Sequence, residues 1–341
     1  MKYDIVYITS IPAFYKINLF NRIAKEKKIL VIFLCDTHVE RNSDFYKGER
    51  SFDFISIANR NFFLKFIFCF NSFFINHSEY REVIISGWDY LFYWIIALLS
   101  PIIKNSMVIE SSYLESQSSG LKKWMKKMIL SRISRVYASG RAQKKLVEKI
   151  GFRGEIIITQ GVGIFNIVSQ PKYKYKENIN NFIFVGRLSK EKNLAYLIEV
   201  FNEFPQLTLN IIGFGPEEEY LKSISSSNII FHGAVPNSSL KTYFCQNDVF
   251  ILPSLREVWG LVVEEALNNG LPVIVSDKVG CAEEIVIADY NGLIFELGNT
   301  VDLKLKILKM ADPLFYNKLS QNISKLDFNE VALKQTTCYL H

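Results

Sequence analysis

Glu257, Gly260 and Glu265 stand at close spacing in residues 254–266, which read SLREVWGLVVEEA. Glu257 precedes Gly260 by three positions, and Glu265 follows Glu257 by eight. The apolar residues after Gly260 predict a helix over 261–268. One carboxylate should therefore lie in a loop and the other inside the helix that the loop introduces.

The start of this helix is suited to bind an anion. Its first backbone N–H groups lack partners within the helix, and the helix dipole favours negative charge there. These groups belong to Gly260, Leu261 and Val262. A carboxylate beside a bound diphosphate is repelled unless it has donors of its own, and sugar hydroxyls are such donors. We expect Glu257 to accept from a hexose and Glu265 from a ribose. The alternative is an ordinary helix whose two acids pair with lysines.

A second loop, VGRLSKEKN at 185–193, follows an apolar run and introduces another predicted helix. Gly186 permits a tight turn there. Arg187 and Lys192 are five positions apart, so both can converge on one anionic group. Arginine offers phosphate oxygens a planar fork, and lysine offers a point charge. The alternative is a capped helix start with incidental charges.

A third loop, IIGFGP at 211–216, also follows a predicted strand. Gly213 and Gly215 would let the backbone approach a ligand closely. The third glycine of a dinucleotide fingerprint is missing, because position 218 is Glu218. The loop therefore indicates a nucleotide site only when it is taken together with the other motifs. Taken alone, this sequence is more typical of an ordinary turn.

Alternating strands and helices position these loops. In the second half we expect strands at 182–185, 207–212, 229–232, 249–252 and 272–276, and helices at 194–202, 217–223, 240–246 and 261–268. The first half offers strands at 3–8, 30–35, 82–86, 107–110, 135–138 and 155–159, with a helix at 17–26. This alternation predicts an α/β chain with two doubly wound, parallel-sheet domains in tandem. Ligands in such sheets bind at the carboxyl ends of the strands.

The polar stretch 170–181 is the best candidate for a linker, which divides the chain into domains at 1–170 and 171–324.

Together these motifs resemble the retaining glycosyltransferases of family 4, or glycosyl transferases group 1. The pair Glu257-(seven residues)-Glu265 lies within PSLREVWGLVVEEALNNGLPVIVS, and VGRLSKEKN, IIGFGP and FHGAV match in order and spacing. The resemblance covers about residues 180–300 and is loose over 1–170. It implies the GT-B fold: two Rossmann-like domains facing a central cleft, the donor on the C-terminal one. In that fold the last helix, about 325–341, returns to the first domain.

The resemblance implies roles for the matching residues. Arg187 and Lys192 would bind the donor diphosphate and stabilise its charge as the glycosidic bond breaks. Glu257 would contact the transferred sugar, and Glu265 would hold the ribose. The remaining donor-binding positions would be Gly186, Gly213, Gly215, His232, Val235, Gly260, Leu261 and Val262. The donor would be a nucleotide-sugar, with a UDP-sugar favoured, and no metal or cofactor is implied. The sequence contains no Asp-x-Asp pair.

The acceptor side departs from the family. Many members carry a histidine after the strand that precedes the basic helix, but here that stretch reads MVIESSY, and Glu110 or Ser111 occupies the position. Glu110 is a candidate catalytic residue that would orient the acceptor hydroxyl or the donor sugar; the alternative is a surface acid. Pro12, Phe14 and Tyr15, in the loop after the first strand, could stack on a sugar or cover the domain edge.

The charge is unevenly spread, with a net of +10 over residues 1–170 and −4 over 171–341. The densest basic segment, LKKWMKKMIL at 121–130, predicts an amphipathic helix. Its apolar stripe and flanking lysines suit peripheral contact with an anionic membrane, and equally suit an ordinary surface helix. A nucleic-acid partner is not expected, because no nucleic-acid motif accompanies the charge.

The apolar stretches 61–75 and 83–103 are interrupted by charges, glycine or proline, so neither supplies the roughly 20 uninterrupted apolar residues that a membrane span needs. We expect both to be buried core elements. The five cysteines show no paired or metal-binding spacing, so we expect reduced thiols and a cytoplasmic protein, with possible peripheral contact at the inner face of a bacterial plasma membrane.

The leading hypothesis is a retaining hexosyltransferase that uses a lipid-linked or cell-surface polysaccharide acceptor. One alternative is a GT-B sugar-nucleotide epimerase or phosphorylase. Another is a non-catalytic partner subunit that binds a nucleotide-sugar.

Overall fold

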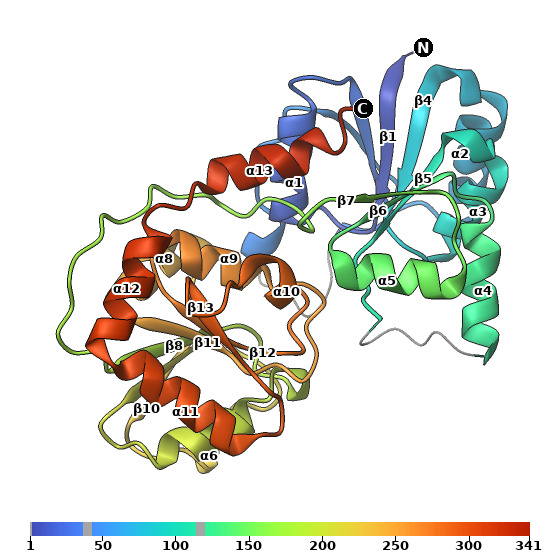
Figure 1. Ribbon diagram of the computed structural model, residues 1–341. Coiled ribbons are helices and arrows are strands. Elements are labelled where there is room, and N and C mark those ends of the chain that lie inside the picture. Colours follow the sequence, from blue (N-terminus) through green and yellow to red (C-terminus); the bar gives the residue numbers. More distant parts are fainter. Residues whose placement is uncertain (1, 37–42, 114–119) are drawn as a thin grey trace. The chain divides into compact units, whose positions relative to one another are not determined.

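The computed structural model describes residues 2–36, 43–113 and 120–341 (Figure 1). The chain forms two compact units. Unit 1 comprises Met1–Phe165 and Glu330–His341, and unit 2 comprises Asn166–Asn329. The first boundary falls a few residues before the predicted linker, and the C-terminal residues belong to unit 1.

Unit 1 is built on a parallel sheet in the order β3-β2-β1-β4-β5-β6-β7. The strands are β1 (Tyr3–Thr9), β2 (Ile29–Phe33), β3 (Asp53–Ser56), β4 (Tyr80–Ile85), β5 (Asn105–Ile109), β6 (Arg135–Ala138) and β7 (Glu155–Ile158). The strand order reverses between β1 and β4, which is where a doubly wound sheet opens a crevice at its carboxyl edge.

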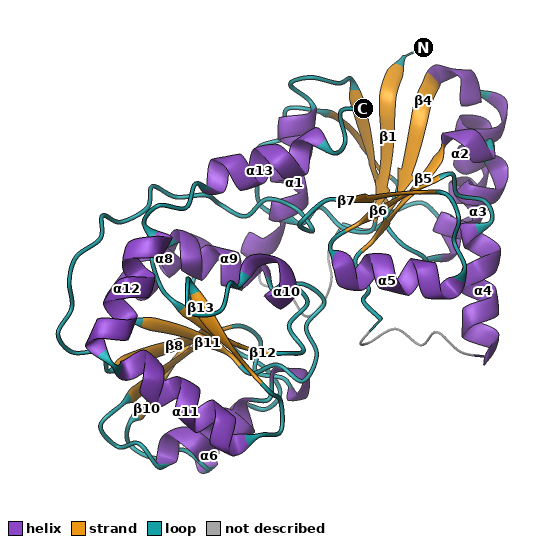
Figure 2. Ribbon diagram, in the orientation of Figure 1, coloured by secondary structure: helices purple, strands orange, loops and turns teal. Residues whose placement is uncertain are grey.

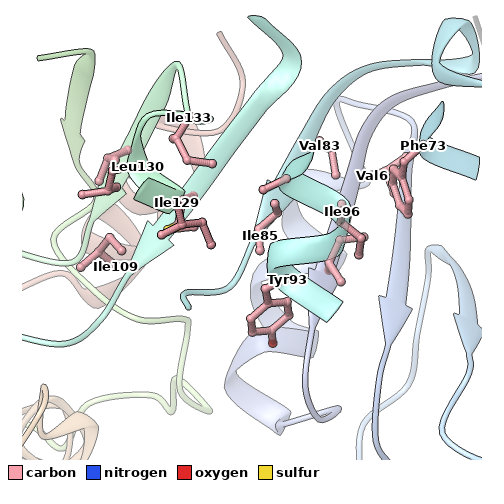
Figure 3. Close-up of a cluster of buried hydrophobic side chains, with 14 of the residues drawn as sticks. Val6, Phe73, Val83, Ile85, Tyr93, Ile96, Ile109, Ile129, Leu130 and Ile133 are labelled. Carbon is pink, nitrogen blue, oxygen red and sulfur yellow. The ribbon is translucent and has the colours of Figure 1, made fainter. Parts of the chain in front are cut away.

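Helices cover both faces of this sheet (Figure 2). They are α1 (Phe14–Ile23), α2 (Phe62–Cys69) with its π-helical continuation η2 (Phe70–Ile75), α3 (Leu91–Leu99), α4 (Gly120–Leu130), α5 (Arg141–Ile150) and α13 (Phe328–Thr337). On one face, Phe73 of η2, Tyr93 and Ile96 of α3 and Ile129 of α4 pack with sheet residues such as Val83 in a single core (Figure 3).

Unit 2 repeats the design with the parallel order β10-β9-β8-β11-β12-β13. Its strands are β8 (Asn181–Val185), β9 (Thr208–Ile212), β10 (Ile229–Gly233), β11 (Val249–Leu252), β12 (Val273–Ser276) and β13 (Gly292–Phe295). Its helices are α6 (Leu194–Asn202), α7 (Glu218–Ser223), α8 (Leu240–Gln246), α9 (Leu261–Asn268), α10 (Ala282–Ile285), α11 (Thr300–Ala311) and α12 (Pro313–Ile323). The predicted fold class, two Rossmann-like α/β domains, is confirmed.

Two edge strands were not predicted. β3 is largely exposed, and its four residues DFIS alternate too briefly to be distinguished from a loop. β13 is only four residues long and begins at Gly292, which reads as a turn residue.

The prediction that residues 61–75 are a buried core element is wrong. Only Cys69 of α2 and Phe73 of η2 are buried, whereas Phe62, Phe63 and Phe74 are more than half exposed. In the stretch 83–103 the prediction holds for β4 and for the inner side of α3. The apolar run itself could not tell a buried helix from an exposed one.

The predicted linker 170–181 has irregular backbone up to β8 but is anchored on unit 2. Lys176 Nζ donates to Asp248 Oδ1 at 2.6 Å, and Asp248 Oδ2 accepts from the N–H of Asn181 at 2.9 Å. The hydroxyl of Tyr173 lies 3.2 Å from Asn317 Oδ1. These contacts make the segment part of the C-terminal unit rather than a free tether.

Candidate functional sites

The loops at the carboxyl edge of the unit 2 sheet are joined by backbone hydrogen bonds. The N–H of Gly186 donates to Ile212 O at 3.0 Å, and the N–H of Gly213 donates to Gly233 O at 2.9 Å. These bonds tie the loops after β8 and β9 to the last residues of β9 and β10, in one row of backbone hydrogen bonds at the edge of the sheet. Gly186, Gly213 and Gly215, which the sequence places after predicted strands, lie in these loops.

Gly213 and Gly215 are required by the close approach of neighbouring backbone. At Gly213 φ is +136°, and a Cβ atom there would lie 1.8 Å from the carbonyl oxygen of Gly186. A Cβ atom on Gly215 would lie 2.4 Å from Leu188 O. Because neither position has room for a side chain, this edge of the sheet presents backbone alone at these two residues. A nucleotide is expected to lie against such a surface.

Lys192 and Glu257, 65 residues apart, form an ion pair. The pairing follows from the backbone, because the N–H of Leu255 donates to Glu191 O at 2.9 Å and ties the two loops together. Both charged side chains are mostly buried, 14% and 19% exposed, so little water screens them. Two residues singled out from separate motifs thus meet at one point.

Arg187 is placed less tightly. Its guanidinium Nη2 lies 3.2 Å from Glu191 Oε1, and both side chains are about a third exposed. It shares the edge of the sheet with Lys192 because both follow β8.

Gly260 begins α9 in the left-handed region, with φ of +96°. The preceding loop is held by Glu257, whose N–H donates to Lys278 O at 3.2 Å and whose carbonyl accepts from Gly280 N–H at 2.9 Å. Within the described part of the chain, the N–H groups of Leu261 and Val262 donate to no acceptor. The sequence predicted these unpaired N–H groups, and the binding of an anion by them stays a prediction.

Glu265 lies in α9, half-buried, and burial raises the pKa of its carboxyl to about 7. No hydrogen bond or ion pair to its side chain occurs among the described residues. Its oxygens remain able to accept from two hydroxyl groups, the capacity that a ribose diol requires.

Glu264 and Trp259 form a contact that sequence reasoning missed. Trp259 Nε1 donates to Glu264 Oε2 at 2.8 Å, and the two residues are each 2% exposed. Burial raises the pKa of Glu264 to about 8, with Trp259 lowering it and Glu265 raising it. Trp259 precedes Gly260, so this bond fastens the loop to the first turn of α9. Nothing in the sequence distinguishes which of the adjacent residues Glu264 and Glu265 faces the interior.

We expect Glu264→Gln to stabilise the protein at pH 8 by about 2 kcal/mol or more, an effect absent near pH 4. Glutamine keeps an oxygen for the Trp259 N–H. In the wild type the folded-state pKa of about 8 exceeds the ordinary value. The folded state therefore holds a proton that the unfolded chain has lost, and stability falls as pH rises between the two values. Urea titrations of both proteins across pH 4 to 9 measure this, and parallel curves would contradict it.

His232 and Val235 lie at the end of β10. The His232 side chain is exposed, with Nε2 2.8 Å from Asn210 Oδ1 and its ring 5.3 Å from that of Tyr243. Val235 is half-buried in the loop that follows. Their backbone groups continue the row that begins at Gly213, where the base of a nucleotide is expected.

Unit 1 has its own pocket, of about 170 Å³, where the strand order reverses. The ends of β1, β4 and β5 and the start of α1 line it, with Ser10, Lys16, Asp89, Tyr93 and Glu110 among the polar walls. Lys16 and Glu110 form an ion pair, and the Lys16 side chain is 6% exposed. Burial lowers the pKa of Lys16, but the Glu110 carboxylate together with Tyr7 and Tyr15 outweighs burial, and the pKa is raised. Glu110 thus lies in a pocket wall.

The predicted acceptor loop is partly helical. Helix α1 begins at Phe14, so Phe14 and Tyr15 lie in its first turn and only Pro12 remains in the loop. The helix begins three residues before the predicted start at 17, directly after the extended Ala13. Tyr15 lines the pocket, whereas Phe14 packs edge-on against Phe45 at 5.8 Å. Tyr15 also packs against Phe45 at 5.8 Å, so contact of either residue with a sugar stays a prediction.

Two searches of the described residues are negative. No group of three or more histidine, cysteine, aspartate or glutamate side chains is placed to hold a metal ion. No helix among them has the length and apolar character that a membrane crossing requires.

Comparison with known proteins places residues 168–325 in the family glycosyl transferases group 1. The chain is 38% identical over 130 residues to an uncharacterized 41.2 kDa protein in the cps region of Klebsiella pneumoniae, covering 37% of this chain and 36% of that protein. It is 36% identical over 174 residues to the O-antigen biosynthesis glycosyltransferase WbnH of Escherichia coli, covering 50% and 48%. These matches span about half or less of the relatives' own length.

Whole-chain similarity appears among solved structures. The crystal structure of Anabaena HepE in complex with UDP and glucose matches with a TM-score of 0.70, at 17% identity and 97% coverage of both chains. At this identity the likeness shows the fold alone.

Proposed function

We propose that this chain, whose residues 168–325 match the family glycosyl transferases group 1, moves a hexose-type sugar from a nucleotide-sugar donor to a lipid-linked or cell-surface polysaccharide acceptor. A UDP-sugar is the favoured donor, and the configuration at the anomeric carbon is retained. The Lys192–Glu257 pair carries this proposal. Lys192 would supply the positive charge for the diphosphate, and Glu257 would accept hydrogen bonds from the sugar hydroxyls. Both side chains lie at the carboxyl edge of the unit 2 sheet, beside the loops that contain Gly186 and Gly213.

The chemistry needs stabilisation of a leaving diphosphate. As the bond from the sugar to the phosphate oxygen breaks, negative charge grows on the diphosphate, and fixed positive groups lower that barrier. Lys192 and Arg187 supply charge, and the Leu261 and Val262 N–H groups supply donors at the helix start. Glu257 holds Lys192 in place and accepts from the sugar.

We propose that the reaction is independent of a metal ion, because these groups already provide the positive potential that a bound cation would provide elsewhere. Full activity after chelation with EDTA and gel filtration is the expected result. Activity that vanishes with EDTA and returns with Mg²⁺ or Mn²⁺ would contradict it.

The acceptor side is assigned to the unit 1 pocket. Lys16, Asp89 and Glu110 offer hydrogen bonds to hydroxyl groups, and Trp88 and Tyr15 supply aromatic faces for a sugar ring. The similarity to WbnH, an O-antigen biosynthesis enzyme, supports a polysaccharide acceptor. The HepE complex with UDP and glucose supports a UDP-hexose donor. Such donors are cytoplasmic metabolites, which supports a cytoplasmic site of action.

The test is a panel of UDP-, GDP- and ADP-hexoses incubated with the purified chain, with and without a lipid-linked glycan extract. We expect nucleotide release from one donor that depends on the extract, and NMR of the product showing the donor's anomeric configuration. An inverted linkage would overturn retention. Donor binding without turnover would favour a partner subunit, and release of a sugar 1-phosphate or an epimerised sugar would favour the other enzyme classes.

A further inference from the structure

One layer of unit 1 presents apolar side chains away from the core. It consists of the helix α2–η2 over residues 62–75, helix α3 and helix α4, which all pack on the same face of the sheet (Figure 3). The elements are mutually in contact. The rings of Phe62 and Phe92 lie 5.4 Å apart, and Arg132, just after α4, donates from Nη2 to Leu98 O at 3.1 Å.

Fifteen of the twenty-nine exposed large apolar side chains of the described residues belong to this layer and its connecting turn η4 (Ile102–Lys104). They are Phe62, Phe63, Leu64, Phe66, Ile67, Phe74, Ile75, Leu91, Leu98, Ile102, Ile103, Leu121, Trp124, Met125 and Met128. Phe63 is 67% exposed and Trp124 is 60% exposed. A water-facing surface rarely keeps so many large apolar groups together without a partner.

The charge of the layer has a single sign. Residues 60–78, 90–109 and 120–133 contain eight lysines and arginines and no aspartate or glutamate. Lys122 and Lys127 are exposed on α4, on either side of Trp124 in the sequence. A partner for this layer must therefore offer both an apolar interior and negative charge.

We propose that this layer docks on the surface of an anionic lipid bilayer, with α2–η2 and the exposed stripe of α4 inserted at the boundary of headgroups and acyl chains. The helix α2–η2 has 14 residues, too few to cross a bilayer and enough to lie along its surface. Trp124 suits the interfacial depth, and the α4 lysines reach the headgroups. A second copy of the chain fits poorly, because it would face eight positive charges with eight more.

This proposal extends the membrane contact expected of residues 121–130. The stripe expected of α4 divides in the structure: Leu121, Trp124, Met125 and Met128 are exposed, and only Ile129 enters the core. Seven of the fifteen exposed side chains, the most from any part of the layer, belong to α2 and η2, which the sequence predicted to be buried. Docking does not depend on the proposed transferase reaction, so vesicle binding and sugar transfer can fail separately.

Flotation of the full chain with vesicles of phosphatidylglycerol and phosphatidylcholine tests the proposal. We expect binding to the anionic mixture and weak binding to pure phosphatidylcholine. The double variant Phe63→Gln/Ile67→Gln should bind about tenfold more weakly or worse, because insertion of each side chain is lost. The variant Lys122→Gln/Lys127→Gln should lose about fivefold per lysine at low salt, and the difference should shrink at high salt.

The matched control is Leu305→Gln/Leu308→Gln, which removes two exposed apolar side chains of α11 in unit 2. It should bind vesicles like the wild type. The proposal is overturned if the wild type does not float with anionic vesicles, or if the α2 variant binds as well as the control. A wild-type dimer that Phe63→Gln/Ile67→Gln splits, with no vesicle binding, would assign the layer to a second copy instead. Unchanged circular dichroism melting of each variant establishes that it is folded.

Discussion

Replacing Lys192 by alanine should lower kcat for sugar transfer by about a hundredfold to a thousandfold, with a smaller effect on KM for the donor. The lysine lies at the edge of the sheet against Glu257, where little water screens its charge. Its contribution should grow as the diphosphate leaves, so its removal should act on the chemical step. Steady-state kinetics with the donor identified by the panel measure the two constants.

Lys190→Ala is the matched control, since Lys190 lies in the same short 3₁₀ turn, two residues away, and is exposed. Its kcat should stay within about twofold of the wild type, because an exposed charge is largely screened. Equal losses for both lysines would mean that general positive charge matters rather than the position of Lys192. If Lys192→Ala or Glu257→Ala transferred sugar at nearly the wild-type rate, the assignment of the donor site to these residues would be wrong.

Substituting Gly213 by alanine should destabilise unit 2 by about 3 kcal/mol or more and abolish nucleotide binding. The new Cβ atom would lie 1.8 Å from the carbonyl oxygen of Gly186, so the two loops would have to separate. That separation would break the row of backbone hydrogen bonds at the edge of the sheet. Differential scanning calorimetry and titration with UDP report the two losses.

The control for this substitution is Gly233→Ala. Gly233 also has a positive φ, +69°, but a Cβ atom there would meet nothing within 4 Å. The expected cost is therefore only the backbone strain of a left-handed alanine, about 1 kcal/mol. If Gly213→Ala and Gly233→Ala destabilise equally, backbone conformation rather than the contact with Gly186 decides the need for glycine.

The arrangement of unit 2 could be predicted because each of its signals is local. An apolar strand followed by glycine or a basic residue identifies a loop at the carboxyl edge, and a parallel sheet brings such loops together without further information. That is why Lys192 and Glu257 meet although 65 residues separate them. The helix over 261–268 was predicted with the bounds that the structure gives to α9.

Unit 1 was less predictable because its features depend on tertiary context. Lys16 and Glu110 are 94 residues apart, and nothing near either residue indicates the other. The exposed apolar helix α2 has the same composition as a buried one, since hydrophobic periodicity records which face is apolar and not what covers it. The choice between Glu264 and Glu265 for the interior likewise depends on where Trp259 packs.

The end of the chain bears on how the protein folds during synthesis. Tyr339 is 3% exposed and stacks on Tyr137 of β6 at 4.6 Å, and Gln335 reaches Gln160 O at 3.4 Å. Unit 1 contains the first strand of the chain and also residues 330–341, which follow unit 2 in the sequence. On the ribosome, unit 2 can therefore complete its fold first, while unit 1 waits with the face around Tyr137 uncovered until residues 330–341 have emerged. During that interval the first half of the chain is the part that chaperones would have to protect.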